Sequence, residues 1–150
     1  MTGKEVHPMK FTKMQGAGND FIVLDNRSGE IRENEYSALA ARLCRRRLSI
    51  GADGLMIVLP AQGIGDYAMW FYNSDGSLGE MCGNGARCIA RYGYDRGLAG
   101  DIQRIETTAG IVVGQRIEEN LYCVRLNDPT DVETEIGIPW DGQILSVSYM

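Results

Sequence analysis

A cysteine that precedes a glycine-rich triplet marks the part of the sequence best suited to chemistry. Cys82 stands directly before Gly-Asn-Gly at 83–85, within EMCGNGARCIARY at 80–92, and the pattern that follows is helical. The first backbone N–H groups of a helix have no partner within it and lie at the positive end of its dipole, so they bind anions, carboxylates included. A thiol at such a helix start has a lowered pKa, because the thiolate is stabilised. This stretch predicts a thiolate base beside a carboxylate-binding turn.

Other roles for Cys82 are a metal ligand, a redox thiol or a packed core residue. Zinc sites use closely paired Cys or His ligands, whereas Cys82 and Cys88 are six residues apart and the only histidine, His7, precedes the first expected strand. The Cys-x-x-Cys spacing of redox dithiols is absent. Core packing remains the alternative for Cys82, and it is the favoured interpretation for Cys88, which lies close to the apolar stripe of the helix. We therefore expect no metal.

Two asparagines outside this stretch are further candidates for binding a ligand. Asn19 follows Gly-Ala-Gly at 16–18, and Asn73 ends an expected strand. A neutral amide can bind either a carboxylate or an ammonium group without adding charge. The competing interpretation is turn formation, which spacing alone favours for both.

Composition limits the possible partners and location. The net charge of −5 argues against nucleic acid and anionic membranes, both of which favour a basic surface. No apolar run approaches the ~20 residues of a membrane-spanning helix, and the N-terminus lacks the apolar core of a signal peptide, so we expect a cytoplasmic protein. A pyridoxal Schiff base would have to use Lys10 or Lys13, and neither stands in a recognisable cofactor context. We expect no cofactor.

The periodicity predicts an α+β fold. A first helix is expected over 33–47, with the basic run 45–47 as its solvated end. A second helix is expected to begin after Cys82 and to stop at Gly97. Cys44 and Cys123 both stand among apolar residues, so we expect them in the core. Strands are expected at 10–15, 21–25, 55–59 and 67–72, followed by a meander from residue 101. The last residues, 141–150, predict a turn that leads into a strand in which the sequence stops, which suggests a piece of a longer protein.

With these residues identified, the sequence closely resembles the diaminopimelate epimerases, which are pyridoxal-independent. The matching stretches are MKFTKMQGAGNDFIVLDN from Met9, GADG at 51–54, FYNSDGSLGEMCGNGARCIARY at 71–92 and TTAG at 107–110. Met9 matches the usual start of the family, which makes residues 1–8 an extension or an expression remnant.

The resemblance implies a two-base mechanism that interconverts LL- and meso-diaminopimelate. One cysteine removes the α-proton as a thiolate, and a second, as a thiol, reprotonates the opposite face. Cys82 matches one of this pair. The positions that hold the carboxylate, the amine and the distal end of the substrate match Asn19, Asn73, Gly83 and Asn84. Position 54 is glycine where some members carry a substrate-contacting glutamine, so it is not counted as a site residue.

The resemblance also implies two similar lobes, each with mixed and antiparallel strands wrapped around a central helix and with the substrate between them. Residues 9–126 would form the first lobe, and 127–150 a linker and the first strand of a truncated second lobe. The partner cysteine would belong to the second lobe, so the chain is expected to be inactive alone unless a homodimer places two copies of Cys82 face to face. The alternatives are a related cofactor-independent enzyme, such as a proline racemase, and a non-catalytic ligand-binding lobe.

Overall fold

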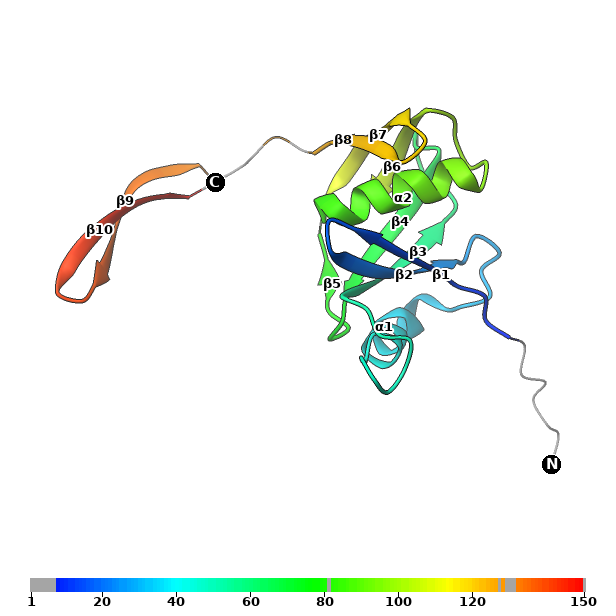
Figure 1. The fold of residues 1–150 in the computed structure, drawn as a ribbon, viewed down its shortest axis with the longest axis horizontal. Helices are drawn as coiled ribbons and strands as arrows, with labels where there is room; N and C mark the ends of the chain where they lie inside the picture. The colour runs from blue at the N-terminus through cyan, green and yellow to red at the C-terminus, as the bar shows by residue number, and fades with distance from the viewer. Residues whose placement is uncertain (1–7, 81, 127, 129–131, 150) are drawn as a thin grey trace.

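An eight-stranded mixed sheet curls around one long helix, α2 (Gly83–Asp95), in the computed structural model (Figure 1). The structure describes residues 8–80, 82–126, 128 and 132–149. The sheet runs in the order β1-β2-β3-β4-β6-β7-β8, with the short β5 paired to β4. Its strands are β1 (Thr12–Gly16), β2 (Asn19–Asp25), β3 (Gly54–Leu59), β4 (Tyr67–Asn73), β5 (Leu78–Gly79), β6 (Ile102–Thr107), β7 (Gly110–Glu118) and β8 (Leu121–Arg125).

Two strand pairs, β2–β3 and β4–β6, are parallel and the others are antiparallel. The α+β architecture expected from the sequence, with mixed strands around a central helix, is therefore confirmed. No helix in the described part of the chain combines the length and apolar character that crossing a membrane requires.

The core lies on both faces of the central strands. Along β2, Phe21 and Val23 pack toward α2, whereas Ile22 and Leu24 face the second helix, α1 (Tyr36–Leu43). This alternation is the ordinary two-residue period of a strand. Because both faces are covered, β2 and β3 are continuous apolar runs in the sequence.

The helix α2 places its apolar stripe in the curled sheet. Ala86, Ile89, Ala90 and Gly93, the residues that recur at helical spacing, are all buried. Gly97 lies after the helix with a φ of 65°, the left-handed conformation expected at a helix stop. The start and the packed face of α2 therefore follow the sequence pattern.

Buried polar groups fix α2 against the sheet. The Tyr67 hydroxyl donates to the Ile89 carbonyl at 2.9 Å and lies 2.8 Å from Gln103 Oε1. The Gln103 amide donates to the Ala90 carbonyl at 2.7 Å. These bonds approach the helix where Gly93 leaves room: a Cβ there would lie 2.4 Å from the Tyr67 hydroxyl oxygen. The position of α2 is thus set by specific buried contacts as well as by apolar packing.

The first helical segment is shorter than the sequence predicted. A 3-10 turn, η1 (Glu33–Glu35), leads into α1, which ends at Leu43. The carbonyls of Leu43 and Cys44 accept from the N–H groups of Gly51 and Ala52 instead of continuing the helical ladder. The prediction that residues 45–47 close this helix is therefore wrong, because the chain turns away before them.

The two cysteines expected in the core differ. Cys44 is 2 % exposed, as predicted. The prediction for Cys123 is wrong, since its side chain is exposed. Tyr122 and Val124 face inward from β8, and the two-residue period of the strand turns Cys123 between them outward.

A hairpin, rather than the single strand expected near the end of the sequence, occupies residues 133–149. β9 (Glu133–Trp140) and β10 (Gln143–Tyr149) pair antiparallel outside the main sheet (Figure 1). Asp141 and Gly142 both have positive φ, as a two-residue hairpin turn requires. The sequence showed this turn, but Gly137 and Pro139 obscured the strand before it. Residues 1–7, 127 and 129–131, on which parts of the expected extension and linker fall, lie outside the described residues.

Candidate active site

Cys82 is the N-cap residue of α2. Its backbone is extended, with φ −137° and ψ 111°, and its carbonyl accepts the first helical bond, from Ala86 N–H at 2.7 Å. Its Sγ accepts a hydrogen bond from Gly85 N–H at 3.4 Å, so the sulfur takes the place that a serine or aspartate oxygen usually fills. The side chain is partly buried. The thiol is thus held at the positive end of the helix, with a backbone donor directed at it.

The turn between β1 and β2 brings Asn19 to the same helix start. Asn84 Nδ2 donates to Asn19 Oδ1 at 2.6 Å, although the two residues are 65 positions apart in the sequence. The close approach depends on Gly16, where a Cβ would lie 3.1 Å from Cys88 Sγ and 3.2 Å from the Asn84 carbonyl oxygen. A Cβ at this position would require the turn or the helix to shift by a few tenths of an ångström.

The other two predicted binding residues are placed differently. Asn73 lies at the same end of the sheet, because Phe21 on β2 pairs with Gly54 on β3, and Gly54 pairs with Asn73 on β4. Its side-chain amide donates to Ser77 Oγ at 2.9 Å, within its own turn. Gly83 opens α2, and a Cβ there would meet only Leu126 Cδ1, at 3.8 Å. The structure therefore joins Asn19 to Asn84 directly, whereas the Asn73 side-chain amide makes its hydrogen bond within its own turn.

An ion-pair cluster that the sequence analysis did not anticipate lies behind Asn19. Asp20 pairs with Lys13 at 2.9 Å and with Arg46 at 2.5 Å, and Arg46 also pairs with Asp53 at 2.8 Å. Hydrogen bonds from Arg46, ahead of the other contributions, hold the pKa values of Asp20 and Asp53 below the ordinary aspartate value. Asp53 follows Gly51 by two residues in the sequence, and only the fold places it beside Asn19.

Lys13 and Arg46 are thereby committed to structural pairs. The Lys13 ammonium also donates to the Gly51 carbonyl, and this contact ties β1 to the turn that precedes β3. The basic run 45–47, predicted as a solvated helix end, thus contributes Arg46 to the support of the candidate site.

Among the residues that the structure describes, no group of three or more His, Cys, Asp or Glu is arranged to hold a metal ion.

The buried thiols differ from Cys82 in their surroundings. Burial raises the pKa of Cys88 to about 11, and burial also raises the pKa of Cys44. Both are therefore protonated at neutral pH and packed in the core. All four cysteines are free.

Two surface hollows adjoin the strands and the helix that carry the candidate site. The larger of two surface hollows, of about 570 Å³, lies between β1 and α2, where Arg87 and Cys88 line it. The smaller is lined from β7 and from the end of β8 onward, by residues that include Arg125 and Leu126. Cys82 lines neither hollow. A small ligand bound at Cys82 would therefore need a second surface to enclose it, since ligand sites bury most of the ligand.

The comparison with known families decides the relationship. The family model for diaminopimelate epimerase matches residues 11–129. The chain belongs to the diaminopimelate epimerase family. It is 47 % identical over 113 residues to diaminopimelate epimerase from Caldanaerobacter subterraneus, covering 75 % of this chain and 39 % of that protein. It is 46 % identical over 133 residues to the enzyme from Halothermothrix orenii, covering 87 % and 44 %. The chain thus spans less than half the length of these two relatives.

Solved structures share the fold at low sequence identity. A hydroxyproline epimerase from Agrobacterium vitis, with bound trans-4-hydroxy-L-proline, matches with a TM-score of 0.68 at 15 % identity, over 93 % of this chain and 48 % of that one. A phenazine biosynthesis protein of the PhzF family from Bacillus anthracis matches with a TM-score of 0.61 at 21 % identity, over 87 % and 43 %. These similarities establish the fold alone.

Proposed function

We propose that this chain supplies one half of the active site of a pyridoxal-independent epimerase that interconverts LL- and meso-diaminopimelate. The observation that carries the proposal is the position of Cys82 at the N-cap of α2, with Gly85 N–H donating to its sulfur and the Asn19–Asn84 pair adjoining the first helical turn. Membership of the diaminopimelate epimerase family supplies the substrate.

The chemistry follows from this placement. The Cys82 thiolate takes the α-proton, so the C–H bond breaks, an S–H bond forms and the electron pair stays on the substrate. That charge spreads into the α-carboxylate, and the free N–H groups at the start of α2 stabilise it without a pyridoxal ring. A thiol on the opposite face then donates its proton to the carbanion, which inverts the centre. We assign Asn19, Gly83 and Asn84 to holding the reacting end, and Asn73 to the distal end.

One thiol cannot perform both steps with inversion. Cys44 and Cys88 are buried in the core and Cys123 lies on the outer side of β8, so none of them opens a helix as Cys82 does. We therefore expect the 150-residue chain alone not to epimerise diaminopimelate. Detectable interconversion of LL- and meso-diaminopimelate by the purified chain would contradict this expectation.

A homodimer with two facing Cys82 thiols is the one arrangement that would supply both bases from this chain. Sedimentation analysis at micromolar concentration tests it, because a monomer removes this arrangement. We expect the complementary base to come from a second lobe instead.

A chimera tests the assignment of Cys82. This chain replaces the corresponding part of the Caldanaerobacter relative, to which it is 47 % identical over the matched region. We expect the chimera to epimerise diaminopimelate and the Cys82→Ala version to lose about 100- to 10 000-fold of that activity, the usual range for removing a general base. Cys88→Ser is the matched control, since it removes a thiol from the same helix. A Cys82→Ala chimera with undiminished activity would refute the proposal.

Two other functions are separated by simple measurements. A proline racemase-like activity is suggested by the shared fold, and assaying the chimera on proline and diaminopimelate distinguishes them. A non-catalytic ligand-binding lobe would not need a reactive Cys82. We also propose a cytoplasmic location, because the mechanism requires reduced thiols and the cytoplasm maintains them.

A further inference from the structure

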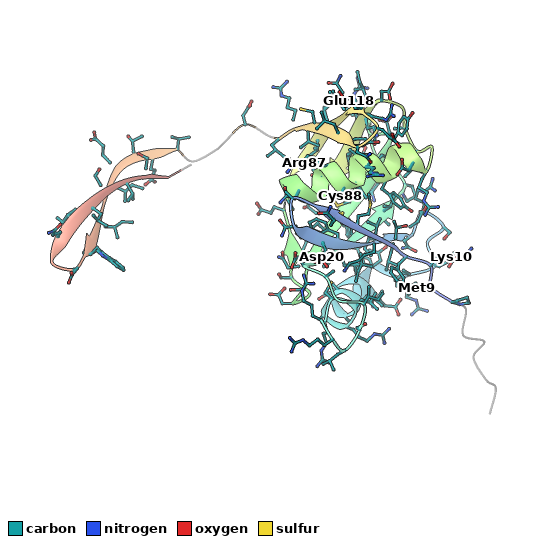
Figure 2. The ribbon with its side chains drawn as sticks, viewed as in Figure 1. Met9, Lys10, Asp20, Arg87, Cys88 and Glu118 are labelled. Atoms are coloured by element: carbon teal, nitrogen blue, oxygen red, sulfur yellow. The ribbon has the colours of Figure 1, made fainter. Side chains whose placement is uncertain are left out.

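A chain of hydrogen bonds links the two asparagines of the candidate site to one charged group at each end. The Arg87 guanidinium donates to Asn84 Oδ1, and Asn84 Nδ2 donates to Asn19 Oδ1 at 2.6 Å. Asn19 Nδ2 in turn donates to Asp53 Oδ2 at 3.3 Å. Figure 2 labels Arg87 on α2 and Asp20, the neighbour of Asn19, on β2, near the same end of the sheet.

The charged ends determine which way both amides point. A carboxylate can only accept hydrogen bonds and a guanidinium can only donate them. Asp53 therefore selects the NH₂ side of Asn19, which leaves the Asn19 oxygen to face Asn84. Asn84 must then present its own NH₂ to Asn19 and its oxygen to Arg87. Reversing either amide would set donor against donor or acceptor against acceptor.

We propose that Asp53 and Arg87 are positioning residues, which hold the Asn19 and Asn84 amides in the single orientation suited to binding a substrate carboxylate. In this orientation each amide uses one N–H within the chain of bonds. Among the described residues, the second N–H of each amide has no protein acceptor, so both are available to a carboxylate. This inference rests on the proposed function for the identity of the ligand. The coupling between the two amides does not depend on that function.

Asp53 is itself held firmly as an ionised acceptor. Asp20 N–H donates to Asp53 Oδ2 and Asp53 N–H to Asp20 Oδ1, each at 3.1 Å, so the two aspartates bond reciprocally. Arg46 lies 2.8 Å from the other oxygen of Asp53, and its hydrogen bond lowers the pKa of Asp53. Asp53 is therefore charged at neutral pH, and its Oδ2 remains directed at Asn19.

The ion cluster also provides a matched control. Asp20 shares Arg46 with Asp53, but its carboxylate makes no hydrogen bond to the Asn19 amide among the described contacts. Asp53→Asn and Asp20→Asn thus remove the same charge from the same cluster. Only the first allows the Asn19 amide to reverse.

The experiment follows the side-chain NH₂ signals of Asn19 and Asn84 by ¹⁵N NMR in the 150-residue chain, assigned with Asn19→Ala and Asn84→Ala. Asp53→Asn is expected to shift the signals of both asparagines, although Asn84 does not touch position 53, and Asp20→Asn is expected to move the Asn84 signals much less. In the unsubstituted chain, acidification that protonates Asp53 should move the Asn84 signals too, which tests the coupling without any variant. If neither Asp53→Asn nor the titration moves the Asn84 signals, the inference is wrong.

Binding of meso-diaminopimelate to the chimera with the Caldanaerobacter relative, carrying the same substitutions, separates this inference from the proposed function. Loss of the orienting bond should weaken binding about 3- to 10-fold in Asp53→Asn, as expected for one hydrogen bond, with a smaller effect in Asp20→Asn. Coupled amide signals without any diaminopimelate binding would refute the proposed function and leave the coupling established. Binding that is equally strong in Asp53→Asn and the unsubstituted chimera would refute the positioning role.

Discussion

Replacing Gly93 with alanine tests the packing that places Cys82. A Cβ at this position would lie 2.4 Å from the Tyr67 hydroxyl oxygen and 2.5 Å from Gln103 Oε1. The Tyr67 hydroxyl donates to the Ile89 carbonyl and lies 2.8 Å from Gln103 Oε1, and the amide nitrogen of the same glutamine donates to the Ala90 carbonyl, so neither side chain can move without disturbing a buried bond. The methyl group therefore forces the helix and the sheet apart or breaks those bonds.

The expected magnitude follows from three contributions. Overpacking costs about 1–3 kcal/mol and an unsatisfied buried polar group about 1–3 kcal/mol, while the better helix propensity of alanine returns about 1 kcal/mol. Gly93→Ala should lower the free energy of unfolding by about 1–5 kcal/mol, which corresponds to a fall in Tm of roughly 2–20 °C for a chain of this size.

Thermal and urea unfolding followed by circular dichroism provide the assay, with Gly83→Ala as the matched control in the same helix. A Cβ at Gly83 meets only one atom, at an ordinary contact distance of 3.8 Å, so this variant should unfold close to the unsubstituted chain. A Gly93→Ala chain as stable as the Gly83→Ala chain would refute the account of how α2 is seated.

Three further predictions concern thiols and charges. At pH 8 iodoacetamide should modify exposed Cys123 quickly and Cys88 hardly at all, because the pKa of Cys88, about 11, leaves it with roughly 100-fold less thiolate than an ordinary thiol. Equal rates for the two cysteines, measured by peptide mass spectrometry, would contradict the burial of Cys88. The Arg46 hydrogen bond lowers the folded-state pKa of Asp20, so the ionised Asp20 stabilises the fold above about pH 4 and this stabilisation is lost as the pH falls below that value. In urea titrations at several pH values, Asp20→Asn should therefore lose less of its free energy of unfolding on acidification than the unsubstituted chain. An equal loss in both chains would count against the ion cluster. Glu106 accepts from three backbone N–H groups within 62–65, so Glu106→Gln should speed hydrogen exchange there, and unchanged protection would show that these bonds do not hold the loop.

Periodicity predicted the elements that carry the site. The stripe of apolar residues on α2 and the Gly-Asn-Gly triplet at its start are local features, and local sequence contains enough to predict them. The first helix ended early because Leu43 and Cys44 bond to residues that follow a turn, a tertiary effect that periodicity does not register. Cys123 was misplaced for a similar reason, since a short strand with several apolar residues does not reveal which face is covered.

The residues that support Asn19 and Asn84 could be identified only from the fold. Asn19 and Asn84 could each be nominated from turn chemistry, but their direct hydrogen bond depends on the close approach that Gly16 permits. Asp53 carries no local motif that points to Asn19 and reaches it only through the pairing of β2 with β3, and Arg46 joins the site only through Asp20 and Asp53. Side chains that act through other side chains are the part of a site that sequence patterns predict least well.

The most direct test of the central claim is the protection of Cys82 from alkylation by meso-diaminopimelate, measured by peptide mass spectrometry on the chimera, which joins this chain to the rest of the Caldanaerobacter relative, with Cys123 as the internal reference. The reference diamine is 1,5-diaminopentane, which has the two amines of the substrate and neither carboxylate. If Cys82 lies over a carboxylate-binding helix start, diaminopimelate slows its alkylation in a saturable way, while the diamine does not and Cys123 is unaffected by either. Alkylation of Cys82 at the same rate with and without diaminopimelate, or equal protection by the diamine, would contradict the account.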